Sequence, residues 1–412
     1  MLVLEKVFVN PDFSTSPVQA FLRVSCTKGQ VRSLRVLSPA YAGGWVESRR
    51  IASQRRPKYV ITLGGTDISK AGSRRGLSTF VCFAKRVRES DLIDKIDKAL
   101  GRYAYSAREV GLGIGDDAAL FRPRAGHELI LTCDWFLEGT HFLRDKHPPD
   151  SVGWKCLARA LSDVAAMGGV PRCFLLSLAI PDSHIGRWLN HFLTGLRRAS
   201  RRFGCVLAGG DTTARESILI NMTVVGEVRT GHAIRRSGAQ DGDSICVSGR
   251  LGEAALGLRV LEASKHAISS RDLRLRKHLY PEPRLALGRW LAEKRLATSM
   301  IDISDGFSTD LRHLCPAPHR GALLAPDCFP AVEVPARLRT RIGEPLDLAL
   351  HGGDDYELLF TVSRRKFPSL PLTYRGLKIS PIGYVTTGPH LVWDSNDAKH
   401  QILRPGGWDP FR

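Results

Sequence analysis

Apolar and polar residues alternate along most of the chain with the periods of helices and buried strands. Helical spacing of apolar residues predicts helices within 90–100, 152–167 and 185–203, and the last two end at Gly168 and Gly204. Apolar runs between these helices predict buried strands at 128–136, 174–180, 205–213 and 218–228. Polar residues follow the apolar part of two of these strands, where α/β proteins commonly place their ligand sites.

A connector rich in turn-forming residues, 233–243, follows the last of these strands and predicts a domain boundary. A strand at 244–248 and a helix that runs to about Ala263 open the second half, so we expect domains over 89–235 and 236–412. Residues 1–88 show short apolar pieces without sustained periodicity. They are interpreted as a basic extension: a small β-rich module, a flexible disordered tail, or non-native sequence from an over-early start codon.

The composition is that of a globular protein. With 412 residues, 43% hydrophobic and 25% charged, the chain can bury a sizeable core in two or three domains. No apolar run approaches the length of a membrane span, and the N-terminus lacks the order of a signal peptide. The nine cysteines include no Cys-x-x-Cys pair and no zinc-site spacing, which predicts reduced thiols. We therefore expect a cytoplasmic protein without a membrane partner.

The net charge of +19 is unevenly distributed. Residues 1–88 carry 16 Lys and Arg against 4 Asp and Glu, so most of the excess lies in the first fifth of the chain. An enzyme body with a basic extension explains this distribution at least as well as a nucleic-acid-binding domain does. We found no discrete nucleic-acid-binding motif and expect no nucleic-acid partner for the body.

Five short stretches carry acids next to glycines or hydroxyl residues, and the chain around 111–120 is the first of them. They lie at 113–117, 132–134, 209–213, 302–306 and 352–355. Taken singly, such acids could simply form turns or cap helices. For Asp163, helix spacing alone favours an ion pair with Arg159, four residues earlier. Together, hard oxygen ligands without His or Cys suit Mg²⁺ shared with substrate phosphates. The chain has neither a P-loop nor a protein-kinase signature, so phosphoryl transfer requires another architecture.

In this order the motifs closely resemble those of the thiamine-monophosphate kinases. The resemblance runs from about Glu89 to the C-terminus and leaves only residues 1–88 outside it. The motifs that carry it are Gly113-Ile-Gly-Asp-Asp117, Thr132-Cys-Asp134 with His141, Leu161-Ser-Asp163, Gly209-Gly-Asp-Thr-Thr213, Asp302-Ile-Ser-Asp-Gly306 and Gly352-Gly-Asp-Asp-Tyr-Glu-Leu358. It implies the two-domain aminoimidazole ribonucleotide synthetase-like fold. That fold has an α/β N-terminal domain with a mixed sheet and helices, an α+β C-terminal domain, and a homodimer formed through N-terminal strands.

The resemblance also implies an activity, the transfer of the γ-phosphoryl group of ATP to thiamine monophosphate, which gives thiamine diphosphate. Implied ligands of several Mg²⁺ ions are Asp117, Thr132, Cys133 through its backbone, Asp134, Asp163, Asp211, Asp302 and Asp305. Implied ATP contacts are Gly210, Asp211, Arg236 and Ser304. Implied thiamine monophosphate contacts are His141, Asp354 and Trp408. No general base is implied, because a phosphate-monoester oxygen is already nucleophilic.

Three positions depart from the pattern of this family. Cys133 stands where Thr is common, Asp354 replaces the usual Glu, and Ala160 stands where Asn is frequent. None of these departures removes a proposed carboxylate ligand. Two alternatives remain open: another ATP-using member of the superfamily with a different acceptor, and a nucleic-acid-associated protein that binds through its basic N-terminus.

Overall fold

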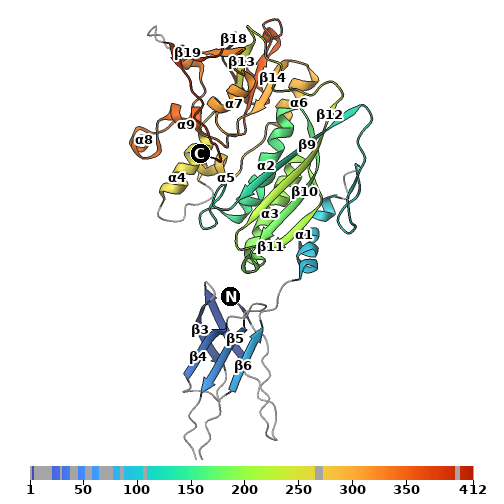
Figure 1. The fold of residues 1–412 in the computed structure, drawn as a ribbon, viewed down its shortest axis with the longest axis vertical. Helices are drawn as coiled ribbons and strands as arrows, with labels where there is room; N and C mark the ends of the chain where they lie inside the picture. Colours follow the sequence, from blue (N-terminus) through green and yellow to red (C-terminus); the bar gives the residue numbers. More distant parts are fainter. Residues whose placement is uncertain are drawn as a thin grey trace, which may run out of the picture. The chain divides into compact units, whose positions relative to one another are not determined.

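The computed structural model describes residues 88–104, 109–264, 272–394 and 400–411, together with six strands in the first 87 residues. The chain divides into two compact units, Met1–Arg86 and Val87–Arg412, and each is described by itself (Figure 1). None of the described helices is long and apolar enough to cross a membrane.

The first unit contains two antiparallel sheets of three strands each. They are β1 (Leu2–Val3), β2 (Phe21–Thr27) and β3 (Gln30–Leu37), and β4 (Trp45–Ile51), β5 (Lys58–Gly64) and β6 (Ser78–Phe83). The interpretations of residues 1–88 as a small β-rich module or as a flexible tail both stay predictions, and the segments between these strands lie outside the described residues. The interpretation as sequence from an over-early start codon stays open.

A four-stranded mixed sheet forms the first half of the second unit, in the order β11-β10-β12-β9. Its strands are β9 (His127–Leu137), β10 (Val170–Ile180), β11 (Val206–Ala214) and β12 (Leu219–Arg229), and only β10 and β11 pair in parallel. The helices of this half are α1 (Glu89–Ala104), α2 (Pro149–Ala166) and α3 (Arg187–Phe203). The predicted elements are thus confirmed within a few residues, and Gly168 and Gly204 have the positive φ of 72° and 67° expected after a helix.

Strand β9 presents two different faces because successive side chains alternate across a strand. Ile130 and Phe136 are buried in the core between the sheet and its helices, and Thr132 and Asp134 share their face. Leu131 and Trp135 belong to the opposite face and are 68% and 55% exposed. The polar end of β9 is therefore directed at α2, while an apolar surface is left on the other side of the sheet.

A short pair of strands, β7 (Val110–Leu112) and β8 (Leu120–Phe121), lies before β9 in the chain and forms a sheet of its own. The second half of the unit is built on an eight-stranded sheet. The order is β14-β16-β13-β18-β15-β19-β20, with β17 paired to β18, and all pairs are antiparallel except β15 with β19. The strands are β13 (Ser244–Ser248), β14 (Ala297–Asp302), β15 (Arg320–Leu324), β16 (Leu358–Val362), β17 (Thr373–Tyr374), β18 (Leu377–Thr387), β19 (Leu391–Asp394) and β20 (His400–Ile402). A largely antiparallel sheet with separate helices is the expected α+β arrangement.

Helix α2 joins the two halves of this unit (Figure 1). The helices of the second half are α4 (Glu253–Ala263), α5 (Arg276–Leu279), α6 (Leu285–Glu293), α7 (Phe307–Leu314), α8 (Ala336–Ile342) and α9 (Pro345–His351). The end of α2 buries Ala165 and Ala166 in the same apolar cluster as Leu287 and Leu291 of α6. A Cβ atom on Gly288 would lie 2.0 Å from the carbonyl oxygen of Ala165, so only glycine permits this close helix contact.

Candidate active site

The centre of the candidate site lies between β9 and α2. The Oγ1 of Thr132 donates a hydrogen bond to Asp163, and Arg159 donates to both carboxylate oxygens of Asp134 at 3.2 and 3.3 Å. The suggested ion pair between Arg159 and Asp163 within α2 is therefore wrong. The strand brings Asp134 to the guanidinium, and Thr132 occupies the carboxylate of Asp163.

Three carboxylates act on one another at this point. Burial raises the pKa of Asp302 to about 8, and the negative charges of Asp163 and Asp134 add to this rise. Burial also raises the pKa of Asp163, and the charge of Asp134 contributes, while Thr132 and Arg236 act in the opposite direction. The structure thus brings Asp134, Asp163, Asp302 and Arg236 into one electrostatic cluster.

The loop after β14 is held by an acid that the sequence analysis missed. One oxygen of Asp310 accepts hydrogen bonds from the backbone N–H groups of Ser304, Asp305 and Gly306 at 3.1, 3.2 and 3.1 Å. Burial raises the pKa of Asp305, and the charge of Arg159 opposes the rise. Asp305 is not the cap of α7, because the N-cap position is Gly306. The side chain of Asp305 is therefore left available at the site.

The C-terminal segment lies against this same loop. The backbone N–H of Trp408 donates to the carbonyl oxygen of Asp305 at 2.8 Å, and Gly406 and Gly407 donate to Ser308 and Thr309 at 3.1 Å each. The indole of Trp408 stays 52% exposed. The structure therefore places Trp408 beside Asp305, although 103 residues separate them.

Asp354 is the acid of its motif that faces the site. Its two oxygens are bound by Lys155 Nζ at 2.7 Å and by the hydroxyl of Tyr356 at 2.5 Å. Burial alone would raise the pKa of Asp354, but the charges of Lys155 and Arg159 outweigh burial and hold the pKa well below its usual range. Both Asp354 and Tyr356 have positive φ, 68° and 50°, which is costly for non-glycine residues. The chain is thus held in a strained conformation that presents this carboxylate.

The other acids of the Asp354 motif have structural roles. Asp355 accepts hydrogen bonds from the N–H groups of Gly252 and Ala254 at the start of α4, at 2.6 and 3.1 Å. Glu357 is fully buried and pairs with Lys277 and with Arg284, whose Nε lies 2.7 Å away. The motif therefore supplies one site residue and two anchors.

A line of buried polar groups continues behind Lys155. Lys155 Nζ lies 3.3 Å from Nδ1 of His278, whose Nε2 lies 2.9 Å from Nε2 of His147. Lys155 and His278 are each only 1% exposed. The sequence analysis missed Lys155, although a charged residue beside the apolar positions of a predicted helix is a usable signal.

His141 is neutral and has a fixed tautomer. Its Nδ1 accepts a hydrogen bond from the backbone N–H of Leu137 at 3.0 Å, so the proton is carried by Nε2. Burial, followed by the charge of Arg159, lowers the pKa of His141 to about 4. The free Nε2–H is therefore a donor at neutral pH.

The remaining predicted residues lie at more open positions. Asp117 and Asp211 are exposed, and the thiol of Cys133 lies against Asn221 on the outer face of the sheet, so only the backbone of Cys133 can take part in the site. A Cβ on Gly210 would lie 2.0 Å from the carbonyl oxygen of Leu176, which explains this glycine. Within the described part of the chain, no three His, Cys, Asp or Glu side chains are grouped closely enough to hold one metal ion.

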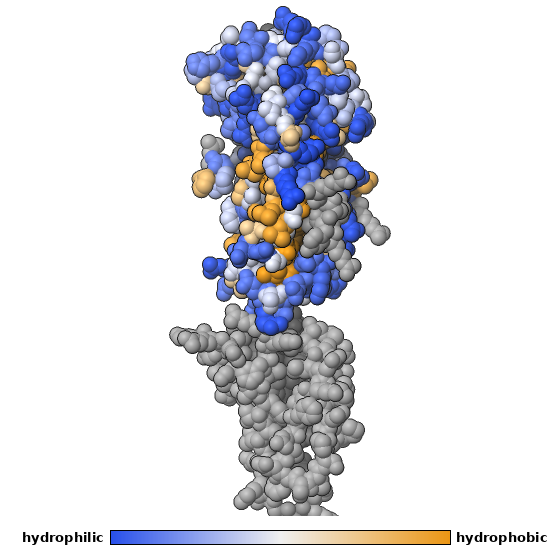
Figure 2. Space-filling model, turned by 90° about the vertical axis from the view of Figure 1, so that its right-hand side faces the viewer, coloured by the Kyte–Doolittle hydropathy of each residue, from blue (hydrophilic) through white to orange (hydrophobic). Residues whose placement is uncertain are grey.

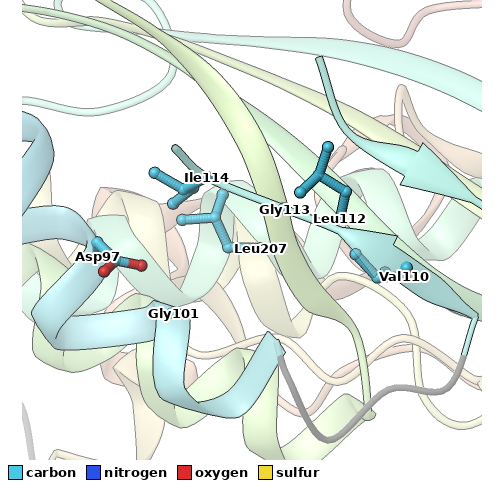
Figure 3. Close-up of a pocket in the computed structure, with 8 residues that line it drawn as sticks. Asp97, Gly101, Val110, Leu112, Gly113, Ile114 and Leu207 are labelled. Atoms are coloured by element: carbon cyan, nitrogen blue, oxygen red, sulfur yellow. The ribbon is translucent and has the colours of Figure 1, made fainter. Parts of the chain in front are cut away.

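The first glycine-rich stretch lines a small cavity of about 20 Å³, which is room for little more than one water molecule (Figure 3). Val110, Leu112, Ile114 and Leu207 supply apolar walls, and Asp97 of α1 adds one carboxylate. The cavity is too small for a nucleotide. Asp116 and Asp117, which follow this stretch in the chain, are both exposed.

The donor types of the central cluster suit a divalent cation, although its carboxylates are not grouped closely enough to hold one ion by themselves. Its groups are carboxylate and hydroxyl oxygens, with the one nearby thiol turned to the other side of the sheet. Asp302 is 2% exposed; burial raises its pKa, and the negative charges of neighbouring acids add to this rise. A cation among these oxygens would favour their ionised forms and offset the repulsion.

Comparison with known proteins gives a consistent result. Residues 115–228 match the N-terminal domain of AIR synthase related proteins. The chain is 35% identical over 320 residues to the thiamine-monophosphate kinase of Escherichia coli K12, which covers 77% of this chain and 97% of the relative. The structure is similar to that of thiamine-monophosphate kinase from Stenotrophomonas maltophilia K279a, with a TM-score of 0.63, 34% identity, and coverage of 74% of this chain and 95% of that one.

A further similar structure is that of AaThiL complexed with AMPPCP and TMP, with a TM-score of 0.60 and 30% identity. It covers 81% of this chain and all of the other. The match extends over nearly the whole length of each of these three proteins. The fold, the ordered motifs and these matches together show that the chain belongs to the thiamine-monophosphate kinase family.

Proposed function

We propose that this protein transfers the γ-phosphoryl group of ATP to thiamine monophosphate and releases thiamine diphosphate and ADP. The observation that carries the proposal is the family membership, together with carboxylates gathered where β9, α2 and β14 meet. A phosphate that attacks another phosphate faces strong charge repulsion, and a site of this kind must offset it.

Mg²⁺ is the cation that we propose for the site. The residues that would hold it are Thr132, the backbone of Cys133, Asp134, Asp163, Asp302 and Asp305, together with Asp117 and Asp211 from the exposed rim. When bound, such ions neutralise phosphate charge and align the attacking oxygen. The raised pKa of Asp302 supports this assignment, since a buried acid surrounded by acids needs a positive partner to ionise.

The nucleotide would lie along Gly210, Asp211, Arg236 and Ser304. Gly210 is exposed on β11, where its backbone lies against Leu176, and Asp310 holds the loop that carries the Ser304 hydroxyl. Arg236 supplies positive charge next to Asp163. These groups bind and orient the donor, and positioning of this kind carries much of the rate in phosphoryl transfer.

The acceptor would be held by His141, Asp354 and Trp408. The Nε2–H of His141 can donate to a phosphate or ring acceptor, and the ionised Asp354 can accept from the amino group of the pyrimidine or face the cationic thiazolium. Lys155 and Tyr356 hold the carboxylate of Asp354, and the backbone at this position has a positive φ, so the shorter side chain is presented in a fixed position. The exposed indole of Trp408 can stack on an aromatic ring.

A homodimer is part of the proposal. The outer face of the first sheet carries exposed apolar side chains, among them Leu129 at 46%, Leu131 at 68%, Trp135 at 55% and Leu175 at 36% exposure (Figure 2). The pairing register places Leu175, Thr223 and Cys133 side by side on this face. A contiguous apolar surface of this kind favours association, and a second copy of the same sheet is the occupant that we propose.

The proposal is tested by ADP release from the full chain with ATP and Mg²⁺. Thiamine monophosphate should stimulate release, whereas thiamine, which lacks the phosphate acceptor, should not. If ATP binds but neither compound stimulates ADP release, the acceptor is wrong and another reaction of the superfamily takes its place. Salt-sensitive RNA binding by the full chain in the same preparation would support the nucleic-acid alternative.

A further inference from the structure

A second pocket lies on the connector between the two halves, and its charged lining residues are cationic. It has a volume of about 270 Å³, and its lining includes His232, Arg235, Ser237 and Gly238 of the connector together with Arg295 and Thr298. Arg235 and Arg295 are exposed, and neither forms an ion pair within the described part of the chain. The pocket is smaller than the roughly 300–1,000 Å³ typical of drug-sized ligands, which favours a small ligand.

The guanidinium of Arg295 is held in place by a histidine rather than by an acid. Nη2 of Arg295 lies 3.2 Å from Nε2 of His232, and Nδ1 of His232 lies 3.2 Å from the carbonyl oxygen of Ala292. A carbonyl can only accept, so Nδ1 carries the proton and Nε2 accepts from Arg295. One donor of the guanidinium is thereby fixed, and its charge is left without a counterion.

The backbone at Arg295 is held in an unfavourable conformation. Its φ is +49°, a region where arginine is uncommon, and Lys366 Nζ donates to its carbonyl oxygen. Strain of this kind at an exposed position is frequently associated with a functional site.

The connector adds further donors. Within the described residues, the backbone N–H groups of Ser237 and Gly238 find no protein acceptor. The acids that contact lining residues are already engaged: Glu128 accepts from the N–H of Gly231 at 3.0 Å, and Asp243 accepts from Thr298 at 2.6 Å. Neither acid lines the pocket.

From these groups we infer that the pocket is a binding site for a phosphate-class anion, separate from the carboxylate cluster. Two guanidinium groups and the N–H groups of a turn match the several acceptor oxygens of a phosphate. Two adjacent arginines belong to different sites. Arg235 lines the pocket, whereas Arg236 does not line it and its charge lowers the pKa of Asp163 in the carboxylate cluster. Free inorganic phosphate and the phosphate of a nucleotide share this chemistry.

The test is isothermal titration calorimetry of the full chain with inorganic phosphate at low ionic strength. Mg²⁺, nucleotide and thiamine monophosphate are left out, so that no other phosphate competes for the pocket and the acidic cluster holds no cation that would attract phosphate. We expect R295G to weaken phosphate binding by about tenfold or more, because a charge-assisted hydrogen bond is lost. Glycine accepts the positive φ at this position, so R295G removes the side chain without added backbone strain.

The matched control is R365M, which removes one exposed arginine outside the pocket. Equal phosphate affinity in R295G and R365M would overturn the inference, as would the absence of phosphate binding by the unmodified chain. A loss of binding in R236M but not in R295G would also overturn it, because the anion would then belong to the carboxylate cluster. A second experiment titrates ADP under the same conditions. If ADP binds more tightly than phosphate and R295G abolishes that binding, the site is assigned to a nucleotide phosphate. If ADP binds equally or more weakly, the site is assigned to free phosphate.

Discussion

The contact between Lys155 and Asp354 makes a quantitative prediction for K155M. Lys155 is 1% exposed and its Nζ lies 2.7 Å from Asp354, so the variant leaves a carboxylate without its main partner. Removing one member of a buried pair costs about 3–5 kcal/mol, and because the side chain of Asp354 is 29% exposed we expect the lower end of that range, about 3 kcal/mol. Methionine fills most of the volume of the lysine stem, so the loss is mainly electrostatic.

The pH dependence of this loss follows from the lowered pKa of Asp354. An acid whose pKa is depressed in the folded state contributes stability above its unfolded pKa of about 4, and this contribution is lost as the pH falls through the folded value. The difference between the unmodified protein and K155M should therefore be full at pH 7 and should shrink below about pH 4.

Urea unfolding followed by tryptophan fluorescence measures the loss, with K98M as the control at an exposed lysine. The double variant K155M/D354N removes both charges and should recover much of the stability of K155M, since the replacement of both partners is far less costly than the loss of one. The reasoning is refuted if K155M loses less than about 1 kcal/mol, or if the double variant is no more stable than K155M.

Three further predictions concern the carboxylates and the sheet surface. D302N should raise the melting temperature of the Mg²⁺-free protein, and the increase should be larger at pH 8 than at pH 5. The raised pKa of Asp302 makes its ionisation in the folded state unfavourable as the pH rises towards about 8, and the variant removes this cost; an equal increase at both pH values would contradict the reasoning. D211N should lower the rate of ADP release by several orders of magnitude with unchanged unfolding, whereas D241N at an exposed position should not, and near-normal turnover would remove Asp211 from the mechanism. L131D should shift the protein to monomers in sedimentation velocity by burying a charge in the proposed interface, and an unchanged mass would move the interface elsewhere.

The sequence predicts the elements of the first half well because their signals are local. The periodicity of α2 and its terminal Gly168 depend on neighbours within a few residues, and the helix is confirmed within three residues at its start. Two acids of the central cluster, Asp134 and Asp302, could also be named, since each ends an apolar run that becomes a buried strand, whereas Asp163 lies on α2 and was named through the family resemblance.

The partners of those acids could not be predicted, because they come from distant parts of the chain. Lys155 and Asp354 are 199 residues apart, and nothing in either neighbourhood indicates the other. Helix spacing favoured an ion pair between Arg159 and Asp163, but in the folded chain Arg159 pairs with Asp134 of β9 instead. The order of the eight-stranded sheet is likewise set by long-range packing rather than by any local pattern.

The exposed thiol of Cys133 allows the outer face of the four-stranded sheet to be labelled chemically. Cys133 and Cys328 are the exposed free cysteines among the described residues, and Cys133 lies on the same face as Leu131 and Trp135. A maleimide should modify Cys133 readily in a dilute, dissociated sample and slowly once a second copy covers the face, while Cys328 supplies an internal reference rate. Cys133, which stands where threonine is common in the family, therefore allows the proposed dimerisation to be followed without an introduced labelling site.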